Sequence, residues 1–396
     1  MFTSCLNLCL LIAWPAPAQR TPPPASFAQL STKADAARDA NRLDEAVPLY
    51  RKALALRPAW REGWWSLATI LYDQNSYAPA ARAFTKAVAL DPKNGTAHLM
   101  LALCQYELRQ DDRAIANIKA ARALGIRDDD QLERVLEYHE GLLLLRKRDY
   151  ERAIDAFKSL VVQGVNSEDL DFALGLAVLL IDPKTAPPEG SPDRQIVLRA
   201  GRAEHLSLLK RYDEAKQAYS DLAREFPDFR NVHYAFGRYF LAVREPESAL
   251  PQFQEEINRQ PSHIRARMQI AAVKYRVDSP GGVPYAAEVV KLDPAYPFGH
   301  YMLGLLYFDS GDTQRAIPQL ETAVRMVPTE AQFYFALGTA YAKVGRKADA
   351  ARVRATFRKL DADTKVVNAP NTYGDQAPTM NHAPGPAPET SETKHP

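Results

Sequence analysis

Apolar residues recur three and four positions apart in two runs between residues 64 and 92, separated by a polar break at 73–76. Residues at this spacing share one face of a helix. The two runs therefore predict a first helix and a second helix, with inward-facing positions Trp64, Leu67, Ala68 and Leu71, then Ala80, Phe84 and Ala87. Ala68 and Ala80 are small where two antiparallel helices would cross closely. Pro92 cannot continue the second helix, so it marks the end of the hairpin.

The same pattern recurs along most of the chain, mainly at steps of 33 or 34 residues. One hairpin cannot bury its apolar face alone, so recurrence is what the pattern requires. The small residue of the first helix returns as Ala34, Ala102, Gly141, Gly175, Ala203, Gly237, Ala271, Gly304 and Gly338. The small residue of the second helix returns as Ala46, Ala114, Ala153, Ala215, Ala249, Ala316 and Ala350, and the closing proline as Pro58, Pro227, Pro261, Pro294 and Pro328.

This coincidence of bulky, small and closing positions resembles the tetratricopeptide repeat family, whose unit is a helical hairpin of about 34 residues. The resemblance implies an all-α, right-handed superhelical solenoid of antiparallel helical hairpins. We expect about nine hairpins, arranged as an N-terminal block over residues 27–181 and a C-terminal block over residues 193–360. The family further implies that first helices line the concave side, where peptides or partner helices bind.

The proline-rich stretch 182–192 interrupts the pattern, because four prolines and a glycine in eleven residues exclude a helix. A first helix over residues 171–181 precedes it, and no second helix is expected to follow. We therefore expect two cooperative blocks, unless that first helix joins the two halves. Residues 361–396 lose the apolar periodicity and become rich in proline, so they are expected to be a disordered tail.

Residues 1–18 have the features of a secretory signal peptide, with an apolar run followed by Ala16-Pro17-Ala18. No basic residue precedes that run, which leaves a frayed helix or a misplaced start as alternatives. The run is too short to span a bilayer, so no stable membrane insertion is expected after its removal. We expect a bacterial exported protein of the periplasm or the exterior, with the cytoplasm as the alternative.

Charge and cysteine content exclude several functional classes. A net charge of +2 gives no electrostatic case for nucleic acid. Three cysteines, two of them within the first nine residues, cannot form a disulfide framework, and Cys104 falls at a packing position of a first helix. The basic run 146–148 lies at a turn, where a solvated cluster is expected.

No residue pattern for catalysis was found: phosphate-binding loops, nucleophile elbows and zinc motifs are absent from the sequence. His233 and His300 occupy the register of Trp64, so packing explains them better than catalysis. We expect no enzyme activity, no catalytic residues, no metal, no cofactor and no small-molecule substrate.

A second stripe on the first helices is the candidate binding site. In the hairpin described above Trp65 and Tyr72 lie on it, apart from the positions that face the partner helix. The complete stripe consists of Trp65, Tyr72, Tyr106, Tyr138, Tyr234, Arg238, Met268, Tyr275, Tyr301, Phe308 and Phe335. Aromatic residues are enriched at interfaces. The alternative is that individual rings pack between adjacent hairpins.

The sequence therefore predicts a non-enzymatic protein-interaction scaffold that binds a peptide or partner protein. A structural subunit of a cell-envelope assembly is the main alternative. An accessory array for a separate enzyme is a third, because repeat arrays of this kind are attached to glycosyltransferases. Tyr234, Tyr301 and Phe335 are expected to be partly exposed in the free protein.

Overall fold

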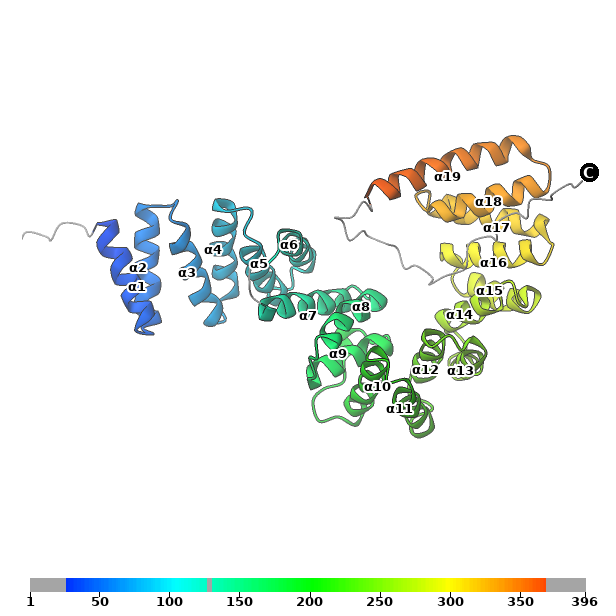
Figure 1. Ribbon diagram of the computed structural model, residues 1–396, viewed down its shortest axis with the longest axis horizontal. Coiled ribbons are helices and arrows are strands. Elements are labelled where there is room, and N and C mark those ends of the chain that lie inside the picture. Colours follow the sequence, from blue (N-terminus) through cyan, green and yellow to red (C-terminus); the bar gives the residue numbers. More distant parts are fainter. Residues whose placement is uncertain (1–25, 127–129, 368–396) are drawn as a thin grey trace, which may run out of the picture. The chain divides into compact units, whose positions relative to one another are not determined.

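The computed structural model describes residues 26–126 and 130–367. Every regular element among these residues is a helix, and sequential helices lie side by side as hairpins (Figure 1). The helices form two compact units, unit 1 up to Leu108 and unit 2 from Arg109 onward. This division does not coincide with the interruption at 182–192, where the sequence placed the block boundary. The predicted all-α architecture of antiparallel hairpins is confirmed.

Unit 1 contains two complete hairpins and one further first helix. Its helices are α1 (Phe27–Asp39), α2 (Leu43–Leu56), α3 (Arg61–Asp73), α4 (Tyr77–Leu90) and α5 (Gly95–Glu107). Asn41 and Asn75 adopt a left-handed conformation in the turns of the two hairpins, which asparagine tolerates better than most residues. Ala34 packs opposite Ala46, and both are fully buried. The small residues that recur in the sequence are therefore the positions at which the two helices of a hairpin cross.

Unit 2 continues the same architecture over a longer stretch of chain. Its helices are α6 (Asp111–Leu124), α7 (Asp130–Arg146), α8 (Tyr150–Val162), α9 (Glu168–Val178), η1 (Pro183–Thr185), α10 (Pro192–Leu208), α11 (Tyr212–Glu225), α12 (Val232–Ala242), α13 (Pro246–Arg259), α14 (Ile264–Lys274), α15 (Ser279–Leu292), α16 (Pro297–Asp309), α17 (Thr313–Met326), α18 (Ala331–Lys343) and α19 (Lys347–Val367). Residues 361–367, predicted to belong to a disordered tail, are instead the last turns of α19. The remaining tail and the candidate signal segment lie outside the described residues.

The interruption is bridged by direct packing of α9 against α10. A Cβ atom on Gly175 would lie 2.0 Å from the carbonyl oxygen of Val197, and one on Gly201 would lie 1.6 Å from that of Asp171. The two helix backbones therefore touch, which only glycine permits. The helix α10 also packs on α11, where Ala203 and Ala215 are fully buried. One helix thus covers α9 and begins the next hairpin.

One hydrophobic core cluster includes buried residues on both sides of the interruption, from Leu144 to Ile270. The loop itself is fixed at its start, because Arg148 donates two hydrogen bonds to the Asp182 carboxylate, at 3.0 and 2.8 Å. The packing therefore favours the alternative in which α9 joins the two halves. Separate unfolding of the blocks 27–181 and 193–360 stays a prediction.

Candidate interaction surface

The stripe predicted on the first helices is buried to very different degrees. Tyr234 and Met268 are buried, at 1% and 5% exposure, whereas Phe335 is 40% exposed. The expectation that Tyr234 is partly exposed is therefore wrong. The other stripe residues are half-buried: Trp65, Tyr72, Tyr106, Tyr138, Arg238, Tyr275, Tyr301 and Phe308.

Several stripe rings pack on the second helix of their own hairpin. The ring centroids of Trp65 and Phe84 are 5.5 Å apart, and those of Tyr234 and Phe253 are 5.8 Å apart. At Trp65 and Tyr234, therefore, the stripe belongs to the face that packs on the second helix of the same hairpin. Tyr301 instead lies 4.7 Å from Phe333 of the following hairpin, which is the packing alternative left open by the sequence.

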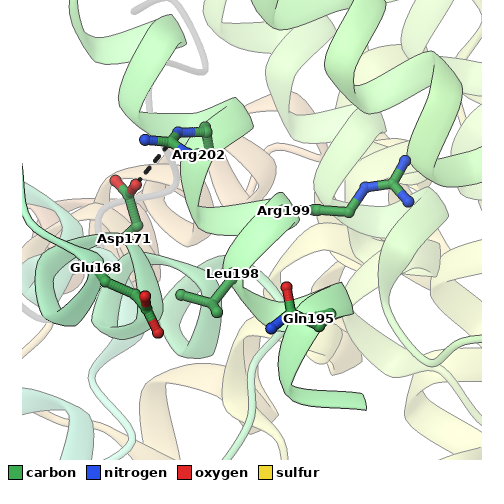
Figure 2. A pocket seen from close by; sticks show the side chains of 6 residues that line it. All are labelled: Glu168, Asp171, Gln195, Leu198, Arg199 and Arg202. Carbon is green, nitrogen blue, oxygen red and sulfur yellow. Dashed lines mark ion pairs between the residues drawn. The ribbon is translucent and has the colours of Figure 1, made fainter. Parts of the chain in front are cut away.

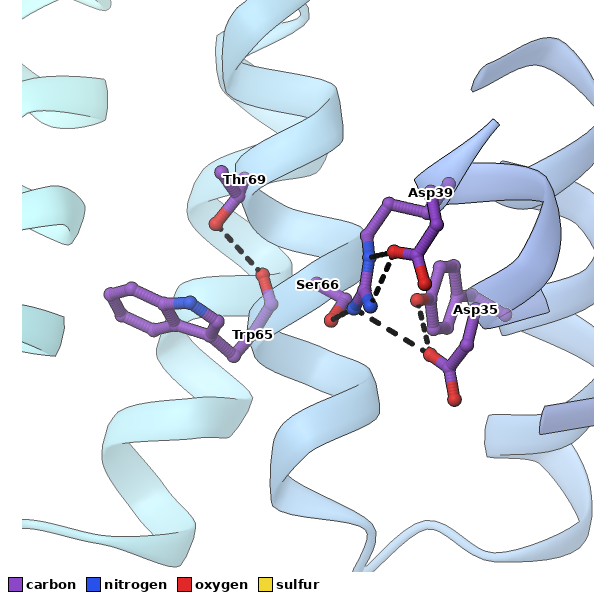
Figure 3. A network of polar contacts seen from close by, with 7 residues as sticks. Asp35, Asp39, Trp65, Ser66 and Thr69 are labelled. Atoms are coloured by element: carbon purple, nitrogen blue, oxygen red, sulfur yellow. Dashed lines mark hydrogen bonds and ion pairs between the residues drawn. The ribbon is translucent and has the colours of Figure 1, made fainter. Parts of the chain in front are cut away.

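In unit 1 the stripe adjoins a network of polar side chains (Figure 3). Tyr50 on α2 donates a hydrogen bond of 2.6 Å to Asp35 on α1. Arg38 donates to Ser66 on α3 at 3.0 Å and to Asp39 at 2.8 Å. The bond from Arg38 to Ser66 connects the first hairpin to the second, and it joins a half-buried arginine to a buried serine. This part of the first-helix face is therefore polar.

In unit 2 the stripe around α12 is covered by another part of the chain. Arg238 forms an ion pair of 2.5 Å with Glu151 on α8, 87 residues earlier in the sequence. The Arg265 guanidinium lies 5.9 Å from the ring centre of Tyr150, also on α8. The start of α8 therefore occupies the surface that Arg238 was predicted to offer to a partner.

A second polar group lies beneath Arg238. Tyr219 on α11 donates a hydrogen bond of 2.7 Å to Glu204 on α10, and burial raises the pKa of Glu204. The Nη1 atom of Arg238 is buried without a hydrogen-bond partner among the described residues. It borders a cavity of about 30 Å³, together with Glu204, which is room for roughly one or two water molecules.

Sequence reasoning missed a buried polar cluster around Asn231, which immediately precedes α12 in the left-handed conformation. Its side chain donates to the carbonyl oxygen of Leu179 at 2.5 Å and contacts His263 Nε2 at 2.8 Å. Glu256 on α13 accepts the backbone N–H groups of Asn231 and Tyr234, both at 3.0 Å. The cluster links the end of α9 to α12, α13 and α14. Its single sequence signal is an asparagine at a helix start.

The histidines in the Trp64 register do pack, as predicted, and each has a defined polar contact. Trp64 donates from Nε1 to the carbonyl oxygen of Pro58 at 2.8 Å, and His300 Nε2 lies 3.0 Å from that of Pro294. His233 and His300 are each 8% exposed. Cys104 is likewise buried, and burial raises the pKa of its thiol to about 12.

The remaining polar features give no separate chemical site. A hollow of about 260 Å³ lies at the α9–α10 crossing (Figure 2), where Arg202 is 3.5 Å from Asp171. Asp171 is also 2.7 Å from His205 Nδ1. In the basic run 146–148, Lys147 and Arg148 are exposed, as expected of a solvated cluster, whereas Arg146 is largely buried. Each of the three is also bonded to an aspartate, Asp111, Asp112 and Asp182 in turn. The described residues contain no group of His, Cys, Asp or Glu that could hold a metal, and none of their helices is long and apolar enough to cross a membrane.

Comparison with known families identifies the class to which these hairpins belong. A tetratricopeptide repeat model matches residues 31–81, 66–129, 138–182 and 301–354, and a second tetratricopeptide repeat model matches residues 198–228. The chain belongs to the tetratricopeptide repeat family.

Individual relatives are more distant. The chain is 23% identical over 296 residues to human protein O-mannosyl-transferase TMTC3, which covers 73% of this chain and 29% of that protein. The mouse protein of the same name is 34% identical over 70 residues, or 18% of this chain and 8% of that protein. The chain thus spans less than a third of the length of these relatives.

Solved structures of MamA are also similar. One has a TM-score of 0.39 at 17% identity, covering 41% of this chain and 96% of that chain. MamA from Desulfovibrio magneticus RS-1 has a TM-score of 0.37 at 22% identity, covering 43% of this chain and 98% of that chain.

Proposed function

We propose that this chain is a non-enzymatic scaffold that binds a peptide or partner protein along the exposed parts of its first-helix face. One observation carries the proposal: the ring of Phe335 is 40% exposed, and most other stripe rings are only half-buried, on helices whose opposite faces already seal the hairpins. Accessible rings lose little conformational entropy on binding and supply large contact area. Membership of the tetratricopeptide repeat family supports the same proposal.

The proposed surface excludes the region around α12. Tyr234 is buried and Arg238 is paired with Glu151, so neither is available without rearrangement. Binding is assigned to α1, α3 and α5 in unit 1, and to α14, α16 and α18 in unit 2. Of the remaining stripe residues, Tyr138 lies on α7 and Tyr275 directly follows α14, and the others lie on α3, α5, α14, α16 and α18, where Met268 on α14 is buried.

Site-specific photo-crosslinking in the native host tests the proposal. A photoreactive amino acid at Tyr106 or Phe335 should form a discrete crosslink to one protein. The matched control is Tyr212 on α11, a second helix, whose side chain is 43% exposed and which should form none. Equal crosslinking from all three positions, or none from any, would remove the case for a first-helix binding face.

An accessory array for a separate enzyme is a second candidate, because the matched relatives are named as transferases. In that case the chain would position a catalytic protein or domain and would itself have no active site. Transfer of an activated sugar by a co-purified complex, but not by the chain alone, would favour this candidate. A structural subunit of a cell-envelope assembly would instead co-purify as a stable complex without turnover.

We also propose that the chain acts outside the cytoplasm, on the basis of the apolar run and small-residue site within residues 1–18. N-terminal sequencing of protein from the native host should begin at Gln19. An intact Met1 in a cytoplasmic fraction would contradict export.

A further inference from the structure

The start of α8 contacts the first-helix face of unit 2 through two side chains. Glu151 forms an ion pair of 2.5 Å with Arg238 on α12. Tyr150 faces α14, where the Arg265 guanidinium lies 5.9 Å from its ring centre. We name these two interactions the α8–α12 contact and call it closed when the ion pair is present. Both side chains of the ion pair are partly exposed, and such a pair contributes little net stability, so a change of charge beside it can decide whether it persists.

Arg238 extends from this ion pair to an interior cavity. Its Nη2 atom bonds to Glu151, whereas its Nη1 atom is buried and has no hydrogen-bond partner among the described residues. Besides Arg238, the cavity of about 30 Å³ is lined by Glu204, Val178, Ala235, Tyr239 and Ala242. Glu204 is the one carboxyl group among these lining residues. A buried donor without an acceptor is unfavourable, so Arg238 can gain by a further contact on the side of Glu204.

Groups on three neighbouring helices act on the charge of Glu204. Tyr219 on α11 donates a hydrogen bond of 2.7 Å to its carboxyl group. Burial raises the pKa of Glu204, and the charge of Glu151 on α8 adds to that rise. The charge of Arg238 on α12 and the hydrogen bond from Tyr219 act in the opposite direction. The net direction is upward, so the folded chain keeps the proton of Glu204 to a higher pH than an exposed glutamate would.

Other titratable groups near this site have partners of their own. On α10 itself, the neighbouring His205 lies 2.7 Å from Asp171 of α9. On α8, burial raises the pKa of Asp155, and the charge of Arg238 opposes that rise. Asp155 is therefore a second carboxyl group that responds to Arg238, and a test must separate its titration from that of Glu204.

The charge of Glu204 and the position of α8 depend on each other. While the contact is closed, Glu151 neutralises Arg238 and disfavours a second carboxylate nearby. When α8 moves away, Arg238 loses this counter-charge, and the carboxyl group of Glu204 is the one in the cavity that can replace it. Movement of α8 away from α12 therefore favours ionisation of Glu204. Because coupling between two equilibria is reciprocal, ionisation of Glu204 favours movement of α8 to the same extent.

We propose that the α8–α12 contact is a proton-linked switch: it is closed while Glu204 holds its proton, and it opens when Glu204 loses that proton to solvent and pairs with Arg238 at the cavity. A rise in pH therefore opens the contact, and a fall in pH closes it. Release of one proton changes the ratio of open to closed chains by at most about tenfold per pH unit. Opening uncovers Arg238 on the first-helix face. The inference concerns the free chain and goes beyond the proposed partner binding.

A nuclear magnetic resonance titration of the full chain, with carbon-13 in the glutamate carboxyl groups, measures the coupling. The signal of Glu204 is the one that disappears in Glu204→Gln, which also separates it from Asp155. In Glu151→Gln the titration midpoint of Glu204 should fall below that of the wild type. The matched control is Glu247→Gln, which removes a carboxylate from an exposed position of α13 and should leave the midpoint unchanged.

Distances between spin labels measure the movement of α8. Labels at the exposed positions Lys158 on α8 and Asn258 on α13 suit this test, in a chain with Cys5 and Cys9 replaced by serine. The fraction of long distances should rise between pH 5.5 and pH 8. In the same labelled chain, Glu204→Gln should keep the short distance at both pH values. Glu151→Gln should give the long distance at both, and since its side chain is partly exposed it keeps the test decisive if Glu204→Gln fails to fold.

Three results would overturn the proposal. The first is a distance distribution of the wild-type chain that is the same at pH 5.5 and pH 8. The second is an equal response to pH in Glu204→Gln, which would assign the titration to another group such as Asp155. The third is an unchanged midpoint of Glu204 in Glu151→Gln, which would show that the two carboxyl groups are not coupled through Arg238.

Discussion

Gly175→Ala is expected to loosen the packing of α9 on α10 and to destabilise unit 2. The added Cβ would lie 2.0 Å from the carbonyl oxygen and 2.8 Å from the carbonyl carbon of Val197. An ordinary carbon–oxygen contact is longer by more than about 1 Å. Since the obstructing atoms belong to the backbone, one helix must move away from the other. That movement uncovers Leu174 and Val178, which are now 0% and 2% exposed.

The magnitude follows from two opposing effects. Overpacking a well-packed core costs about 1–3 kcal/mol and occasionally more, and a backbone obstacle belongs at the upper end. Replacing glycine by alanine within a helix returns up to about 1 kcal/mol. We therefore expect a net loss of about 2–3 kcal/mol in the free energy of unfolding of this region.

Gly338→Ala is the matched control, because Gly338 occupies the same register position of α18. Its Cβ would meet Cγ of Arg354 at 3.1 Å and Cγ2 of Val353 at 3.2 Å, so side chains rather than backbone must yield. Here the helix-propensity gain should dominate, leaving stability unchanged or increased by up to about 1 kcal/mol. Replacing glycine by alanine is thus expected to lower stability at Gly175 and to keep or raise it at Gly338.

Hydrogen exchange measured by mass spectrometry resolves the two regions within one chain. Amides of α9 and α10 should exchange faster together in Gly175→Ala, while those of α18 and α19 should be unchanged or slower in Gly338→Ala. Equal effects of the two substitutions would refute the argument from backbone contact. Faster exchange in α9 alone would show that the stability of α10 does not depend on its packing against α9.

Two further predictions concern buried side chains. Burial lowers the pKa of His263 to about 4, below its unfolded value of about 6.5. The folded state therefore keeps the ring neutral below pH 6.5, where the unfolded state takes up a proton and gains stability. The free energy of unfolding should consequently fall by about 2 kcal/mol between pH 7.5 and pH 5. Urea titrations should show a weaker loss in His263→Asn, which keeps a side chain able to cap α14, and an equal pH dependence would contradict this assignment. Tyr301→Ala should cost about 3 kcal/mol, because its ring packs on Phe333 at 4.7 Å. Phe335→Ala, at 40% exposure, should cost no more than about 1 kcal/mol, and melting curves that rank the two in reverse would show that core and surface have been confused.

The hairpin architecture could be read from the sequence because its rule is local and periodic. Ala68 and Ala80 are separated by twelve residues, and both are fully buried where the helices cross. Each hairpin repeats this requirement, so errors at single positions do not alter the fold. The limits of α9 differ by about three residues from the predicted first helix, as is usual for helix ends.

The packing across the interruption could not be read in the same way. Gly201 lies two positions before Ala203, outside the repeat register, and its role depends on the approach of another helix backbone. The pairing of Arg238 with Glu151 likewise depends on how tightly successive hairpins curve, which no spacing within one repeat encodes. The repeat period predicts on which face of a first helix each stripe residue lies. The exposure of its side chain depends in addition on contacts between distant repeats.

The missing second helix after α9 explains why a polar cluster formed where it did. A helix end that is not covered by its own hairpin partner leaves carbonyl groups that need other donors. Asn231 supplies one such donor to Leu179, and its left-handed conformation is held by Glu256 through the backbone N–H. The interruption is therefore sealed both by apolar contact with α10 and by polar contact with α12. The polar contact uses the side chain of the residue before α12, so the surface around α12 serves the stability of unit 2. Tyr234 is buried and Arg238 is paired with Glu151 at the same place, and we therefore leave this surface out of the proposed binding face.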